Sequence, residues 1–462
     1  MSEATKGRAG GLDRIGTVDG VLKRFANGDR RATRVQEQLE RIADGAGEGS
    51  HAFLKVYGTA VAEAESFDRA ARQGDALPPH AGVTVSIKDL FDVAGDVTTS
   101  GSVLLKSAAP AASDAEAVAR LKSAGFIPVG RTNMTEFAFS GLGINPHYAT
   151  PLNPYDRESR RIPGGSSSGA AVSVSDGMAT VALGTDTGGS CRIPAALCGL
   201  VGFKPTASRV PSGGVMPLST SLDSIGSIGH SVACCAAVDE VVSGEAFVPS
   251  PVDLSSLTFC VPSSYVFDDI DQPTATAFDR ALGRLSAAGV EIVTTDMPEL
   301  IDIPAINAKG GLAAREAYIY HRRWLEEHGR EYDPRVLVRI LKGEAQSDAD
   351  YRAVQRARSE LIGKAEASTR RFDAVVMPTV PKIAPRLNEL ADDDAYGRIN
   401  LLMLRNPTVA NMLDRCAISL PCHEADEPPV GFMLMGRRME DHRLLKIAGM
   451  VERLVSASRW VS

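Results

Sequence analysis

A glycine- and serine-rich stretch between residues 163 and 205 constrains this chain more than any other feature. It reads PGGSSSGAAVSVSDGMATVALGTDTGGSCRIPAALCGLVGFKP, two Gly/Ser-rich turns joined by a short apolar segment. Glycine loses more conformational freedom on folding than any other residue, so glycines at this density indicate tight turns or a ligand that approaches the backbone closely. The stretch is therefore the first candidate for an active site.

The composition excludes several classes of protein. The 462 residues are 44% hydrophobic and 23% charged, and the net charge of −7 argues against a nucleic-acid surface. The seven cysteines are odd in number and show no CxxC spacing, so we expect neither a disulfide framework nor a metal site. We find no apolar signal segment and no run of about 18 apolar residues that could span a membrane, so we expect a cytoplasmic protein without membrane contact.

The first part of the chain predicts helices followed by a parallel crossover. Apolar residues keep helical spacing over 18–25 and again over 35–42, which indicates a helical hairpin. Residues 82–88 (GVTVSIK) alternate with the strand period of two, and Lys88 ends the polar edge of this strand. Ser113 and Glu116 predict a capping box for a helix that stops at Gly125, before a short strand at 126–129.

The later part predicts further strands and helices of one α/β layer structure. We expect a helix start at 170–174, a buried strand at 178–183, a strand–helix–strand unit within 254–293 and charged helices over 312–370. Short strands follow at 373–377, 418–420 and 430–435. Residues 131–162 are too rich in Gly, Pro and Asn for regular structure, and as a loop they could line a pocket with the apolar side chains Met134, Phe137, Phe139 and Tyr148.

Two interpretations of the glycine stretch have little support from its sequence. A phosphate cradle is one, but neither G-x-x-x-x-G-K-[ST] nor a G-x-G-x-x-G after a strand is present. A nucleophile elbow is the other: residues 165–169 satisfy G-x-S-x-G, with Ser167 as nucleophile, a downstream acid, and His230, His321, His328, His423 or His442 as base. His321 and His328 lie seven residues apart in a charged helical segment, where we expect a solvated face. The elbow requires a buried strand that leads into it, and residues 158–163 (ESRRIP) do not read as one.

A third interpretation needs no histidine. A lysine that burial keeps neutral can accept the proton of a serine, and Lys88 at the end of its strand is a candidate. The second Gly-Gly-Ser places Ser190 where small residues leave backbone N–H groups available to an oxyanion. From the residues alone this arrangement is only permitted, because a lysine after a strand is more often solvated.

Several segments together resemble the amidase signature family. VSIKDLFDV (85–93), PGGSSSGAA (163–171), GTDTGGSCRIPAALCGLVGFKP (184–205) and SLDSIG (221–226) occur in the family's order and spacing. RTNMTEFAFSG (131–141), TPLNPYD (150–156), DAVVMPTVP (373–381) and PPVGFMLMG (428–436) extend the resemblance over most of the chain. Two positions depart from the family pattern: Ser168 stands where glycine is commoner, and Cys191 where an aliphatic residue is usual.

The resemblance implies a fold and a division of the chain. It implies an α/β amidase signature fold, with a large mixed central β-sheet flanked by helices on both faces. We expect one domain over 1–462, with N-terminal helices in 1–60, a catalytic core in 61–245, a helix-rich part in 245–370 and C-terminal strands and a helix in 371–462.

The resemblance also implies the site residues. The family's triad is a lysine, a serine held by a cis peptide and a nucleophilic serine, and its two serines stand 24 residues apart, as Ser166 and Ser190 do. Lys88 is then the base, Ser166 the bridging serine and Ser190 the nucleophile. Four backbone N–H groups are expected to form the oxyanion hole, those of Thr187, Gly188, Gly189 and Ser190. Ser167 is expected to orient its neighbours through hydrogen bonds, and Asp186 and Arg192 are expected to shape the turn as an ion pair. Burial and positive neighbours such as Arg192 are expected to lower the pKa of Lys88.

The implied activity is hydrolysis of a small carboxylic amide to a carboxylate and ammonia or an amine, through an acyl-enzyme on Ser190. Amide and water are then the substrates, no cofactor or metal takes part, and a homodimer is expected from the family. The glutaminase subunit of a tRNA-dependent amidotransferase is an alternative, as is a non-catalytic binding module.

Overall fold

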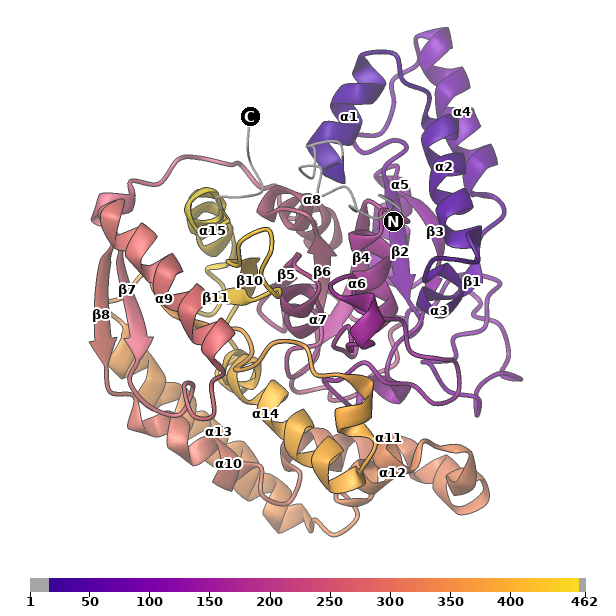
Figure 1. The fold of residues 1–462 in the computed structure, drawn as a ribbon. Helices are drawn as coiled ribbons and strands as arrows, with labels where there is room; N and C mark the ends of the chain where they lie inside the picture. Colours follow the sequence, from indigo (N-terminus) through magenta and orange to yellow (C-terminus); the bar gives the residue numbers. More distant parts are fainter. Residues whose placement is uncertain (1–15, 457–462) are drawn as a thin grey trace, which may run out of the picture.

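The computed structural model describes residues 16–456, and its centre is one mixed β-sheet. The sheet has 11 strands in the order β1-β3-β2-β4-β6-β5-β10-β11-β9-β7-β8. Figure 1 shows this sheet running through the molecule, with the N-terminal helices beside one end and β7 and β8 at the other. The α/β class and the mixed central sheet expected from the sequence are confirmed.

The strands are short and most are fully buried. Their bounds are β1 Phe53–Val56, β2 Thr84–Lys88, β3 Ile127–Thr132, β4 Val181–Asp186, β5 Val201–Lys204, β6 Ser224–Gly229, β7 Thr258–Pro262, β8 Glu291–Thr295, β9 Ala374–Pro378, β10 Ala417–Pro421 and β11 Gly431–Met435.

The helices fall before, between and after these strands. Their bounds are α1 Val18–Ala26, α2 Arg31–Ala43, α3 Gly49–Ala52, α4 Ala60–Gln73, α5 Glu116–Ser123, α6 Ser168–Ser175, α7 Arg192–Leu197, α8 Val232–Ser243, α9 Gln272–Ala287, α10 Asp302–Ile306, α11 Gly311–His328, α12 Pro334–Leu341, α13 Asp348–Thr369, α14 Asp393–Met412 and α15 Asp441–Val455.

Helices cover both faces of the sheet, because alternate strand residues point into different apolar clusters. On β2 and β4, Val85, Ile87 and Leu183 pack into a cluster with residues of α5 and α8. Ala182 points the other way, into a cluster with residues of α2, α4 and α6. A side chain on either face of a central strand is therefore shielded from water.

The predicted parallel crossovers are present. Strand β2 pairs in parallel with β3 through α5, and β7 pairs in parallel with β8 through α9. The capping box predicted from Ser113 and Glu116 is wrong, since α5 has Ala115 as its N-cap residue, without a side-chain cap. The N–H of Ala115 donates instead to the carbonyl of Asp92, so a neighbouring loop fixes the start of the helix.

Residues 131–162 are largely irregular beyond the end of β3, as predicted. The loop contains two single 3₁₀ turns, and it contributes a buried strip around Ser140 and Gly141. The seven cysteines all lie buried as free thiols.

Candidate active site

The site forms at the carboxyl ends of two neighbouring parallel strands. Strands β2 and β4 pair in parallel, and each is followed by a segment of the predicted site. Open α/β sheets commonly bind ligands at this edge, because the connections that leave the strands there can surround a molecule. Lys88 is the last residue of β2, and the turn that holds Ser190 follows β4.

Lys88 is fully buried. It is therefore not the solvated lysine that is usual at the end of a strand. The polar side of β2 faces α6: Ser86 Oγ lies 2.8 Å from Ser173 Oγ. Lys88 Nζ lies 2.8 Å from Ser166 Oγ and donates to Thr185 Oγ1 at 2.9 Å. The structure therefore brings the predicted base to the predicted bridging serine, two residues before α6.

Burial sets the charge state of this lysine. Loss of hydration lowers the pKa of Lys88 to about 8, although the carboxylates of Asp186 and Asp223 act in the opposite direction. The expected direction of the shift is confirmed, but Arg192 is not among its causes. A substantial fraction of Lys88 is thus neutral near pH 8 and able to accept a proton.

Ser166 is held by its backbone. The Gly165–Ser166 peptide bond is cis, in agreement with the family pattern. A Cβ on Gly165 would lie 2.5 Å from the backbone nitrogen of Gly143, so only glycine fits here. The N–H of Gly165 donates to the carbonyl of Gly141 at 2.9 Å, which ties the serine turn to the loop after β3.

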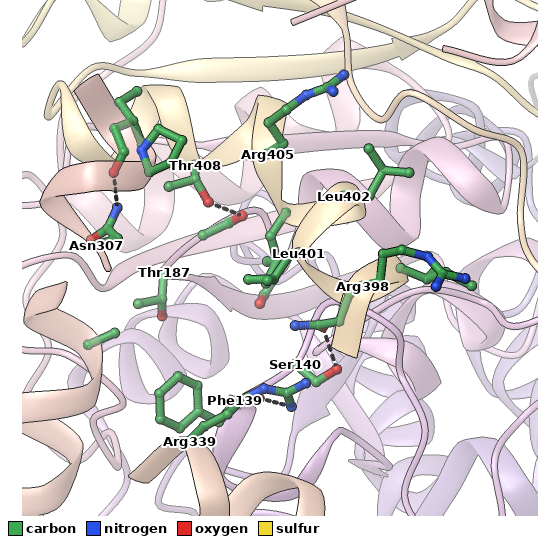
Figure 2. A pocket seen from close by; sticks show the side chains of 18 of the residues that line it. Phe139, Ser140, Thr187, Asn307, Arg339, Arg398, Leu401, Leu402, Arg405 and Thr408 are labelled. Carbon is green, nitrogen blue, oxygen red and sulfur yellow. Dashed lines mark hydrogen bonds between the residues drawn. The ribbon is translucent and has the colours of Figure 1, made fainter. Parts of the chain in front are cut away.

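Ser190 lies in the turn between β4 and α7 and lines a cavity of about 1340 Å³. Thr187 and Gly188 of the same turn line it as well, as do Phe139 and Ser140 of the loop after β3. Figure 2 shows Thr187, Phe139 and Ser140 around this space. The side chain most suited to act as nucleophile therefore faces the space that could hold a substrate.

The predicted Asp186–Arg192 ion pair is confirmed and fully buried. Arg192 Nη2 lies 2.7 Å from Asp186 Oδ1, and Arg192 also donates to Asn411 Oδ1 at 2.7 Å. Burial alone would raise the pKa of Asp186, but the Arg192 guanidinium holds it well below its usual value. The Asp186 carboxylate also accepts the backbone N–H groups of Gly189 and Cys191, so the pair shapes the Ser190 turn.

These hydrogen bonds distinguish the four N–H groups expected in the oxyanion hole. The N–H of Gly189 donates to Asp186 Oδ1 at 2.9 Å, so it is already engaged. Within residues 16–456, the N–H groups of Thr187, Gly188 and Ser190 meet no acceptor in the protein. Gly189 instead has a conformational role, with φ at +128° in the turn.

Ser167 does not have the surroundings of a nucleophile elbow. It is the N-cap residue of α6, and a turn rather than a strand precedes it. Its hydroxyl is buried beside the Cys191 thiol and forms no regular hydrogen bond with the described residues, so the expected hydrogen-bonding role is not seen. Burial raises the pKa of Cys191 to about 12, as expected for an inert filler.

One of the four predicted pocket residues lines the cavity. Phe139 does, whereas Met134 and Phe137 are buried in the apolar cluster on the α5 side of the sheet. Tyr148 is also outside the cavity, with its hydroxyl 3.4 Å from the carbonyl of Ser102. Apolar character alone did not reveal which side of the loop faces the cavity.

The histidines considered as bases have other partners. His321, expected on a solvated helix face, is buried, and its Nδ1 lies 3.0 Å from the hydroxyl of Tyr332. His328 is exposed beside Glu331. Among residues 16–456 there is no group of three or more His, Cys, Asp or Glu side chains suited to a metal ion, and no helix long and apolar enough to cross a membrane.

Some residues of the site were not singled out from the sequence. Thr185 contacts Lys88 from the adjacent strand, and Asn411 reaches Arg192 from a position 219 residues away. Asp223 accepts the hydroxyl of Thr187 at 2.5 Å, and burial raises its pKa to about 6. Thr185 could have been found from the parallel pairing of β2 and β4, whereas Asn411 depends on how distant segments pack.

Comparison with known proteins places the chain in a family. The model of the Amidase family matches residues 34–445. The 2-amino-5-chloromuconic acid deaminase of Comamonas testosteroni is 38% identical, over 85% of this chain and 86% of that protein. The A-type subunit of the glutamyl-tRNA(Gln) amidotransferase of Symbiobacterium thermophilum is 32% identical, over 92% of this chain and 93% of that protein.

The fold agrees with this result. A crystal structure of an amidase superposes with a TM-score of 0.85 at 30% identity, over 95% of this chain and 100% of that one. The chain therefore belongs to the Amidase family, and it is a hydrolase of amide C–N bonds.

Proposed function

We propose that the chain hydrolyses a small carboxylic amide with a Ser-Ser-Lys triad formed by Lys88, Ser166 and Ser190. The observation that carries the proposal is the 2.8 Å contact between Lys88 Nζ and Ser166 Oγ, two fully buried side chains. Neutral Lys88 accepts the proton of Ser166 while Ser166 accepts the proton of Ser190. Ser190 Oγ then attacks the carbonyl carbon of the amide.

The turn after β4 stabilises the negative charge that this attack creates. The N–H groups of Thr187, Gly188 and Ser190 are available to the oxyanion, and one such donor contributes about 3 kcal/mol to catalysis. The proton returns through Ser166 to the amide nitrogen, and ammonia or an amine leaves. Water, activated by the same relay, hydrolyses the resulting acyl-enzyme on Ser190. This route uses no metal or cofactor.

The chain acts as a free-standing amidase in this proposal, and its whole length forms one catalytic domain. The chain is 38% identical to the deaminase and 32% identical to the amidotransferase subunit described above. This difference supports a free-standing amidase over a glutaminase subunit. A cytoplasmic location and a homodimer complete the proposal. A glutaminase subunit instead passes ammonia to a partner protein.

The test is ammonia release from a panel of small amides by the purified chain alone. Ser190→Ala, Ser166→Ala and Lys88→Ala are each expected to lower kcat by about 10³-fold or more, since members of one relay fail together. Ser167→Ala is expected to cause a much smaller loss. A severe loss confined to Ser167→Ala would favour the elbow, and unchanged function in Ser190→Ala would favour a binding module.

A further inference from the structure

A buried asparagine near the end of α14 contacts the turn that precedes Ser190. Asn411 Oδ1 accepts a hydrogen bond from Arg192 Nη2 at 2.7 Å. Its Nδ2 donates to Asp186 Oδ1 at 3.1 Å and to the backbone carbonyl of Asp186 at 3.2 Å. Asn411 is buried and lies outside the cavity, so its amide group acts on the turn and not on a substrate.

Asn411 is itself held in place by two other contacts of this helix end. Arg358 of α13 donates from Nη2 to the carbonyl of Asn411 and from Nε to the carbonyl of Met412, both at 3.0 Å. Four residues before Asn411, the carbonyl of Pro407 accepts Arg192 Nη1 at 2.8 Å. The amide group of Asn411 therefore has a fixed position relative to Asp186.

The carbonyl that Asn411 holds determines the direction of one N–H group of the oxyanion hole. The peptide bond that joins Asp186 to Thr187 is trans, so its C=O and its N–H point in opposite directions. Ser224 Oγ donates to the same carbonyl at 2.9 Å, and Ser224 is also buried outside the cavity. The N–H of Thr187 thus points away from these two buried donors, and Thr187 itself lines the cavity (Figure 2).

The N–H of Ser190 is fixed in a different way. The carbonyl of its peptide bond belongs to Gly189 and accepts the N–H of Ile193 at 2.7 Å, within the first turn of α7. The peptide of Thr187 is held instead by side chains from α14 and β6. Among the oxyanion donors, the N–H of Thr187 therefore depends on a distant part of the chain.

We propose that Asn411 is a positioning residue of the oxyanion hole: it holds the Asp186 carbonyl and thereby directs the N–H of Thr187 toward the oxyanion. Loss of one oxyanion donor lowers kcat by about 10²- to 10³-fold, and a misdirected donor is expected to lose part of that. The full negative charge exists only in the transition state, so the effect falls on kcat and not on KM. The inference rests on the proposed amidase activity and adds a residue that this activity requires.

The test separates transition-state stabilisation from substrate binding. Asn411→Leu keeps a branched side chain without the amide group. With the small amide that the chain hydrolyses fastest, we expect kcat to fall by about 10- to 100-fold and KM to change by less than about 3-fold. The aldehyde of the same carbon chain, such as butyraldehyde for butyramide, adds to Ser190 Oγ without a leaving group and places its oxygen in the oxyanion hole. Its inhibition constant is expected to rise by about 10- to 100-fold.

Ser224→Ala tests the carbonyl separately. Ser224 shares the Asp186 carbonyl with Asn411 but, within residues 16–456, forms no hydrogen bond with Arg192. We expect this variant to lower kcat by about 3- to 30-fold at constant KM, as for loss of one hydrogen bond to the turn. It also keeps the inference testable if Asn411→Leu does not fold.

Asn406→Leu is the matched control on the same helix. Asn406 is also buried, and its Nδ2 donates to the carbonyls of Pro378 at 2.8 Å and Val266 at 3.0 Å, away from the turn. Its replacement is expected to lower the free energy of unfolding. We expect kcat and the aldehyde inhibition constant to change by less than about 3-fold.

Any of four results would overturn the inference. These are kcat near the wild-type value in both Asn411→Leu and Ser224→Ala, a loss in KM with kcat kept, an aldehyde inhibition constant that stays constant while kcat falls, or an equal loss of kcat in Asn406→Leu. Each leaves hydrolysis dependent on Ser190. Full activity in Ser190→Ala would instead refute the proposed function.

Discussion

At the scale of single residues, the burial of Lys88 determines the pH range in which the site works. A protonated lysine cannot accept a proton, so activity requires the neutral form. Because burial lowers the pKa of Lys88 to about 8, kcat/KM is expected to increase from pH 6 and to level off above pH 8. A pH series of kcat/KM on one amide measures this. A flat profile between pH 6 and 9 would contradict the role of Lys88 as base.

The buried ion pair behind the Ser190 turn leads to a second prediction at this scale. Arg192→Met leaves the Asp186 carboxylate buried without its cation, and loss of one partner of such a pair costs about 3–5 kcal/mol. Urea unfolding followed by circular dichroism measures the change. Arg160→Met, an exposed arginine in the loop before the site, is the control and is expected to shift the unfolding free energy by about 0.5 kcal/mol or less.

At the scale of secondary-structure elements, one carboxylate joins the helical region to the strands of the site. Glu316 on α11 accepts the N–H of Ser221 at 3.0 Å, the hydroxyl of Ser219 at 2.7 Å and the hydroxyl of Tyr351 at 2.8 Å. Ser219 and Ser221 belong to the loop before β6, which also carries Asp223. The position of α11 and α13 is thus coupled to the Thr187 end of the cavity.

Removal of this carboxylate is expected to loosen the helical region. Glu316→Ala should lower the free energy of unfolding by about 1.5–3 kcal/mol, because several charge-assisted hydrogen bonds are lost together. Urea unfolding measures the change, and hydrogen exchange should increase first in α11 and α13. Glu344→Ala is the control. Glu344 is exposed, and within the described residues its carboxylate accepts one hydrogen bond, from the hydroxyl of Tyr318 on α11. Equal effects of both variants would contradict the coupling.

Most elements could be predicted from the sequence where local pattern decides the structure. The alternation around Val85 and Ile87 located β2, and the pattern of 254–293 gave β7, α9 and β8 with their parallel pairing. The start of α5 could not be predicted, because a contact from Asp92 replaces the capping box. The prediction of a solvated His321 was wrong for a similar reason. Tyr332 and Phe137 contact this side chain, although the charged sequence of its helix suggests exposure to solvent.

At the scale of the whole molecule, the site depends on segments far apart in the chain. The contacts of Lys88 with Ser166 and of Asp186 with Arg192 join residues that recognisable motifs contain, so the resemblance located them. Arg192 and Asn411 are 219 residues apart in the sequence, and Arg339 and Phe139 are 200 residues apart. No local sequence pattern encodes these two contacts. Such contacts follow from how α12 packs against the loop after β3 and how α14 packs against α7.

The oligomeric state is a prediction at this scale. We expect the purified chain to form a homodimer, and light scattering after size exclusion should give twice the mass of one chain at micromolar concentration. The same sample is expected to release ammonia from amides without any added protein. A monomer would contradict the expected dimer, and activity that requires a second protein would favour the glutaminase subunit.

The burial of all seven cysteines makes the molecule well suited to site-specific labelling. Thiol reagents attack the thiolate, and burial raises the pKa of thiols such as Cys191 and Cys422 to about 12 while shielding them from solvent. Leu401, 69% exposed on α14 at the rim of the cavity, is a position where Leu401→Cys would place one reactive thiol. A fluorophore attached there would report directly on molecules that enter beside Ser190.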